Sequence, residues 1–124
     1  MINLDDLEGS LVSSMVCSGE LPCEPDKDKF KKLILSVEES EFKKSNVWII
    51  RAIKRIIRDT DTLPTMNEVE LFLDLNIPNE NTRQNIISHL FTEVLVFSPM
   101  VYKSFEYYLD MFYKKKAIIK MKGI

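Results

Sequence analysis

SNVWIIRAIKRIIR, residues 45–58, is the stretch of sequence that decides the fold of this chain. Its isoleucines recur at three- and four-residue spacing, which places them on one face of a helix. The β-branched residues would also suit a strand, but the run is too long for a typical one. We therefore predict a central core helix with Ser45 as its N-cap. Its basic residues should point to solvent, and they are Arg51, Lys54, Arg55 and Arg58.

The sequence before this stretch shows the same helical periodicity. Apolar residues at three- and four-residue spacing over residues 4–16 predict a first helix, capped by Asn3 or Asp5. The prolines in residues 19–25 remove backbone donors, so we expect a loop there. A second, short helix should start within residues 26–28.

The sequence after it contains three helix-start signals. Thr65-Met66-Asn67-Glu68 matches a capping box and predicts a helix that starts at Met66 and ends before Ile77-Pro78. The next helix should span residues 82–96, with Asn79 or Asn81 as its cap. Ser98-Pro99 predicts that the last helix begins at Pro99, where a missing amide proton costs nothing.

Length and composition favour one all-α unit. The chain has 124 residues, which suits a single domain, and its three glycines and five prolines are few for a turn-rich β architecture. We expect a compact bundle of about five helices in residues 1–97, followed by a C-terminal helix in residues 98–124 that belongs to the same structural unit.

Charge and hydropathy narrow the class of protein. The net charge of −2 supplies no global attraction to nucleic acid. Residues 1–6 lack the basic start and apolar run of a signal peptide, and no apolar run approaches the ~18 residues that cross a bilayer. We expect a cytoplasmic protein without membrane contact.

The sequence contains no recognisable catalytic or cofactor motif. The glycines are far apart and none begins a phosphate-binding loop. Cys17, Cys23 and His89 are too scattered for a zinc site. We expect reduced thiols and a structural or surface histidine. We therefore predict no catalytic residue, no metal and no cofactor.

The last predicted helix carries more aromatic residues than a small domain needs for its own packing. Exposed aromatic surface is typical of protein interfaces. The predicted interface residues are Tyr102, Phe105, Tyr108, Leu109 and Phe112. Lys114, Lys115 and Lys116 would form its rim or touch nucleic acid.

A DNA-binding function is the alternative from another class. It would need a local basic patch, made by Arg51, Lys54, Arg55 and Arg58 or by the lysines of the last helix. Such charge runs more often only solvate the outer face of a helix.

With the helices placed, stretches that cover most of the chain show a recognisable order of apolar patterns. They are residues 7–12, 34–38, 41–42, 47–57, 63–69, 85–90 and 102–119. In this order they resemble the N-terminal domain of DnaB-type replicative helicases, and residues 102–119 resemble the first arm of its helical hairpin. Lys43-Lys44-Ser45-Asn46-Val47 departs from the aromatic-proline-histidine sequence of the family. The lysine-rich, divergent sequence suggests a phage or mobile-element version.

The resemblance implies a module that dimerises and helps to form the collar of a hexameric ring, in contact with primase or a helicase loader. The chain ends where family members continue into the second hairpin arm and the ATPase. We therefore expect either an excised helicase domain or a stand-alone relative in a bacterial cell. The alternatives from the same machinery are the helicase-binding domain of a primase and a phage protein that mimics or blocks the helicase.

Overall fold

The structure is a computed structural model that describes residues 3–22 and 25–123. Over these residues the chain folds into helices joined by short turns. No strand occurs among those residues, which confirms the predicted all-α class. The α-helices are α1 (Leu4–Val16), α2 (Lys27–Leu35), α3 (Lys44–Thr60), α4 (Met66–Asn76), α5 (Glu80–His89) and α6 (Tyr102–Lys122). Two short 3-10 turns, η1 (Ser18–Glu20) and η2 (Glu39–Glu41), and a π-helical turn, η3 (Leu90–Val94), complete the structure.

Three helix starts follow the capping signals in the sequence. The side chain of Asn3 accepts a hydrogen bond from the backbone of Asp6, and Asn79 does the same for Thr82. Thr65 and Glu68 form the reciprocal capping box at the start of α4. Each cap satisfies amide donors that the first turn of a helix leaves unpaired.

The predicted starts of α3 and α6 are wrong. Ser45 lies inside the first turn of α3, which Lys43 precedes without a side-chain cap. The last helix begins at Tyr102 rather than at Pro99. The backbone before it is held by α1 instead, because the Ser13 hydroxyl donates to the carbonyl of Phe97 and the amide of Met100 donates to the Ser14 hydroxyl.

The predicted helix over residues 82–96 is also shorter and less regular than expected. Its regular part ends at His89, and the chain continues through η3 to Val94. Leu90 and Val94 are nevertheless buried, as their spacing predicts, whereas Phe91 is exposed. The change of helical pitch therefore keeps the main apolar contacts of this segment.

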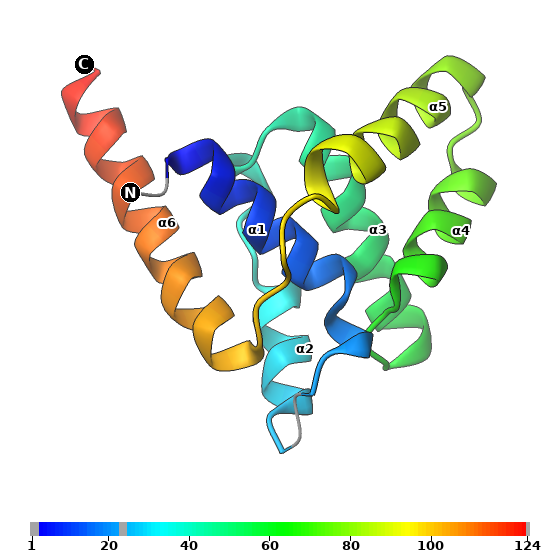
Figure 1. Ribbon diagram of the computed structural model, residues 1–124, viewed down its shortest axis with the longest axis horizontal. Coiled ribbons are helices and arrows are strands. Elements are labelled where there is room, and N and C mark those ends of the chain that lie inside the picture. The colour runs from blue at the N-terminus through cyan, green and yellow to red at the C-terminus, as the bar shows by residue number, and fades with distance from the viewer. Residues whose placement is uncertain (1–2, 23–24, 124) are drawn as a thin grey trace.

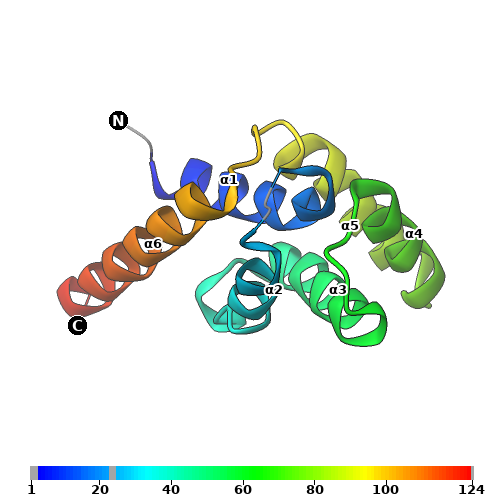
Figure 2. The ribbon, with the colours of Figure 1, turned by 90° about the horizontal axis from the view of Figure 1, so that it is seen from below.

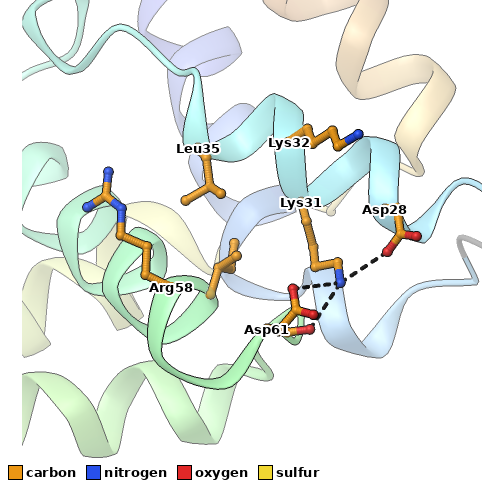
Figure 3. A pocket seen from close by; sticks show the side chains of 7 residues that line it. Asp28, Lys31, Lys32, Leu35, Arg58 and Asp61 are labelled. Carbon is orange, nitrogen blue, oxygen red and sulfur yellow. Dashed lines mark hydrogen bonds and ion pairs between the residues drawn. The ribbon is translucent and has the colours of Figure 1, made fainter.

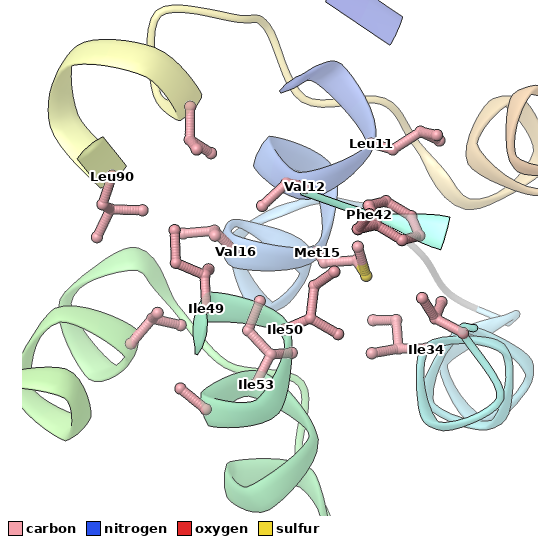
Figure 4. Packing of buried hydrophobic residues seen from close by; sticks show 14 of the residues in the cluster. Leu11, Val12, Met15, Val16, Ile34, Phe42, Ile49, Ile50, Ile53 and Leu90 are labelled. Atoms are coloured by element: carbon pink, nitrogen blue, oxygen red, sulfur yellow. The ribbon is translucent and has the colours of Figure 1, made fainter. Parts of the chain in front are cut away.

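Two helices share the centre of the molecule. α1 packs against α3, α6 and η3, and α3 packs against α1, α2, α4 and α5. In Figures 1 and 2, α6 and the α4–α5 pair lie at opposite ends, with α1 and α3 between them. Figure 4 shows side chains of α1, α2 and α3 meeting in the core, where Leu11, Met15, Ile34, Ile49 and Ile53 are fully buried.

Gly9 allows the chain to pass close to α1. A Cβ atom at this position would lie 2.5 Å from Cε2 of Phe97. The absence of a side chain therefore lets the Phe97 ring pack directly on the helix. This contact positions the connection that leads into α6.

Candidate functional site

The aromatic residues predicted as an interface mostly belong to the core of the chain itself. Tyr102, Phe105, Leu109 and Phe112 are buried, so they are not available to a partner. Phe105 packs on Phe30 of α2, with ring centroids 5.3 Å apart. Tyr108 alone of the predicted set is half-buried. Four of the five predicted interface residues are therefore covered by the chain itself.

The burial of these side chains has a simple geometric reason. Residues 102, 105, 109 and 112 recur at three- and four-residue spacing, which gives α6 one stripe for packing against the rest of the molecule. Phe30 and Phe42 supply the rings that cover it, the second at 4.8 Å from Phe112. The aromatic excess of α6 is thus matched by aromatic residues elsewhere in the chain.

A different face of α6 is exposed, mainly beyond its middle. Met121 is 74% exposed, Ile119 54% and Ile118 50%. Lys115 and Lys122 are exposed as well and have no ion pair among the described residues. We call this set the distal surface, and its members are Lys115, Ile118, Ile119, Met121 and Lys122. It combines apolar area with positive charge.

Three other lysines of α6 are held by the chain itself. Lys114 pairs with Asp110 at 2.8 Å, and the Lys116 ammonium lies 5.9 Å from the centroid of the Phe112 ring. Lys120 pairs with Glu41 of η2. Of the three predicted rim lysines, Lys115 is therefore the most available to a partner.

The predicted arginine patch is smaller than its sequence indicates. Arg51 pairs with Glu39 at 3.2 Å, and Arg55 pairs with Asp59 at 2.9 Å. Arg58 is exposed and makes no ion pair within the described part of the chain. Arg58 is thus the one arginine of this set that is exposed and has no ion pair among the described residues.

Lys54 corrects the expectation that every basic residue of α3 faces solvent. It is 6% exposed and donates a hydrogen bond to the carbonyl of Val37 at 2.7 Å. Burial lowers the pKa of its ammonium group, while the nearby carboxylate of Glu39 acts in the opposite direction. Lys54 therefore ties the α2–η2 connection to α3 and does not contribute to a surface patch.

A hollow between α2 and the end of α3 is organised by one lysine. Its volume is about 530 Å³. Figure 3 shows Lys31 reaching both Asp28 and Asp61, at 3.1 Å each, while Lys32 and Arg58 extend in other directions. Because the Lys31 ammonium is already paired with two carboxylates, we interpret these ion pairs as a structural contact between α2 and the end of α3.

A buried polar network connects α1, α3 and α5. The Glu8 carboxylate accepts hydrogen bonds from the side chain of Asn46 and from the backbone of Lys43. The amide oxygen of Asn46 accepts from Nε2 of His89 at 2.7 Å. Burial lowers the pKa of the imidazole below its usual 6.5. His89 is thereby a structural partner of this network.

Among the residues that the structure describes, the cysteine and acidic side chains form no recognisable metal site. Burial raises the pKa of the Cys17 thiol to about 11, and Glu20 adds to the shift. Cys23 lies outside the described residues. Across the described ranges, no group of three histidine, cysteine or acidic side chains is placed to hold a metal ion. In the same ranges, no helix has both the length and the apolar character needed to cross a membrane.

Sequence reasoning missed an exposed apolar pair on α4. Leu71 is 58% exposed and Leu75 72% exposed. A shallow hollow beside Leu71 is lined by Asn67, Glu70, Asp74 and Ile87. We call this region the acidic face, and its members are Glu68, Glu70, Leu71, Asp74 and Leu75. The spacing of the two leucines, away from the buried Val69 and Leu73, was the signal in the sequence.

Comparison with protein-family models, with curated proteins and with solved structures gave no match to this chain.

Proposed function

We propose that this chain is a non-catalytic assembly and docking module of the DNA replication machinery. It would associate with copies of itself and contact a replicative helicase, a primase or a helicase loader. The proposal keeps the role that the resemblance to the DnaB N-terminal domain implies. It moves the contact from the buried aromatic residues to the exposed end of α6.

The observation that carries the proposal is the distal surface. Ile118, Ile119 and Met121 are half or more exposed on the last turns of a 21-residue helix, beside unpaired lysines. Burying such apolar area against another protein is favourable at roughly 25 cal/mol for each Å². Clustered apolar residues with a polar rim are typical of interaction sites.

Several polar groups outside the distal surface are hydrogen-bonded or ion-paired within the chain, which also supports a docking role. His89, Asn46 and Glu8 bond to one another, and Lys31 joins two helices. These are the groups most suited to chemistry, and each has an internal partner. We do not extend the proposal to DNA, because Lys54 is buried and two of the three arginines are paired.

The experiment measures binding to the DnaB-type helicase and to the primase encoded by the same genome. Each is immobilised and presented with the intact chain, with Ile118→Glu/Ile119→Glu, and with Lys103→Glu as a matched control. Lys103 is an exposed residue of the same helix outside the distal surface. We expect the intact chain and the control to bind, and the double variant to lose about tenfold or more in affinity.

Two measurements together decide the proposal. The mass of the chain in solution is followed by light scattering over a wide concentration range. A chain that remains monomeric and binds neither helicase, primase nor loader contradicts the proposal. A change in helicase loading or unwinding on addition of the chain favours the version in which it regulates the helicase.

A further inference from the structure

Two exposed surfaces of opposite charge lie at opposite ends of the molecule. The distal surface lies on the last turns of α6, and the acidic face lies on α4. Figures 1 and 2 both place these helices at the two ends, with α1 and α3 between them. The two surfaces of one molecule therefore cannot cover each other.

The distal surface presents a regular stripe. Lys115, Ile118, Ile119 and Lys122 occupy positions i, i+3, i+4 and i+7, so they lie on one side of α6. Residues 113–122 contain five lysines and no acidic residue. Two copies of this surface facing each other would bring like charges together, which is unfavourable.

The acidic face has the matching pattern. Leu71 and Leu75 are one helical turn apart and exposed. Glu68, Glu70 and Asp74 flank them, and residues 66–76 contain no lysine or arginine. Asp74 lies 3.6 Å from Arg83 of α5 and Glu68 belongs to the capping box with Thr65, so Glu70 is the carboxylate of this face that has no partner in the described part of the chain. The apolar pair is thus bordered by carboxylates, just as Ile118 and Ile119 are bordered by ammonium groups.

We propose that copies of this chain associate head to tail, with the distal surface of one copy docked on the acidic face of the next. This inference rests on the proposed assembly function and names the surface that receives α6. Apolar residues would cover apolar residues, and lysines would lie beside carboxylates. Opposite charge at the rim selects this pairing over contact between two like surfaces.

The geometry of such a contact has a consequence for assembly. Each copy uses one surface for the preceding neighbour and the other for the following neighbour. A contact between two different surfaces is heterologous and produces a ring or an open chain rather than a closed two-fold dimer. The mass of the assembly therefore grows with protein concentration beyond that of a dimer.

The test uses one variant for each surface in the full chain. Ile118→Glu/Ile119→Glu disables the distal surface, and Leu71→Asp/Leu75→Asp disables the acidic face. All four side chains are half or more exposed, so the fold should persist, and circular dichroism checks this. Each variant alone should be monomeric where the unmodified chain associates, with a dissociation constant raised about tenfold or more.

Mixing the two variants supplies the decisive measurement by sedimentation velocity. The intact distal surface of one variant meets the intact acidic face of the other, so an equimolar mixture should form a dimer and nothing larger. Lys103→Glu should associate like the unmodified chain. High salt should weaken the association, because the charged rims are exposed to solvent.

Other outcomes overturn the inference and leave the proposed function separately testable. If the acidic-face variant still dimerises alone and the mixture gains nothing, α6 pairs with α6 and the docking function stands. A chain that is monomeric at every concentration excludes head-to-tail association. Binding to helicase or primase in that case would preserve the proposed function without self-assembly.

Discussion

The amide oxygen of Asn46 lies 2.7 Å from Nε2 of His89, while the amide nitrogen of the same side chain donates to the buried carboxylate of Glu8. Because that nitrogen faces an acceptor, the Asn46 oxygen must accept, and His89 carries a proton on Nε2. One side chain thus connects an acid on α1 with the single histidine of the chain on α5.

The first prediction concerns pH. The folded protein holds the pKa of His89 below its usual 6.5, chiefly through burial. Well above pH 6.5 the imidazole is neutral in both states and contributes no pH dependence. As the pH falls below 6.5, the unfolded chain takes up a proton first, so the free energy of unfolding decreases. Lys43 acts in the same direction as burial, and Glu93 and Glu8 oppose it.

Urea unfolding between pH 7.5 and about 5.5 checks this prediction. His89→Gln cannot titrate, so its free energy of unfolding should fall less over this range. Carboxylates that titrate in both proteins cancel in the comparison. Parallel curves for the two proteins would show that His89 has the same pKa in the folded and unfolded states.

Removing Asn46 should destabilise the protein. Asn46→Ala leaves the buried Glu8 carboxylate without one of its donors and His89 without its acceptor. The free energy of unfolding should fall by about 1–3 kcal/mol, the usual cost of unpaired buried polar groups. Asn85→Ala, at an exposed position of α5, serves as the control and should change little. Equal effects of the two substitutions would contradict a structural role for the network.

Gly9→Ala tests the close contact between α1 and Phe97. Helix propensity alone predicts a gain of about 1 kcal/mol from this change. We expect instead a loss of about 1–3 kcal/mol, because the new methyl group collides with the ring 2.5 Å away. Phe97→Leu should recover part of the loss in the double variant. The comparison is made by thermal unfolding, and a stabilised single variant would refute the contact.

Lys54 should matter more for stability than Arg58, which lies four residues further along the same helix. Lys54→Ala removes the hydrogen bond to Val37 and the packing of a buried stem, with an expected loss of about 1–3 kcal/mol in the free energy of unfolding. Arg58→Ala should change it by less than about 0.5 kcal/mol, since this side chain is exposed. Similar losses for both would place Lys54 at the surface. Chemical denaturation provides the measurement.

The Cys17 thiol should react slowly with alkylating reagents in the folded protein. Its pKa rises from 9.0 to about 11, so its reactive thiolate is about 100-fold rarer at neutral pH. Alkylation with iodoacetamide, followed at the Cys17 peptide by mass spectrometry, should therefore be much faster in urea. Equal rates in the folded and unfolded chain would contradict the burial of this thiol.

Local patterns in the sequence were sufficient for most of the secondary structure. The capping box at Thr65 and Glu68 and the cap at Asn79 work through atoms three residues apart, so no distant contact is needed to predict them. The isoleucine stripe of residues 45–58 likewise predicts burial of one helix face, and these isoleucines are the buried side of α3.

The errors occur where distant segments compete with local signals. Pro99 is a good first residue for a helix, yet Ser13 and Ser14 of α1 hold the backbone around it and delay α6 to Tyr102. Lys54 has the spacing of a solvent-facing residue, but the carbonyl of Val37 gives its ammonium group an internal partner.

The sequence by itself determined that this protein is helical and where most of its helices begin, because periodicity and capping act within a few residues. Only the tertiary structure decided which apolar face of α6 remains exposed. Phe105 and Phe112 could be assigned to the core only once Phe30 and Phe42 were seen against them. Burial depends on residues far apart in the chain, and a helical pattern shows that a face is apolar without showing what covers it.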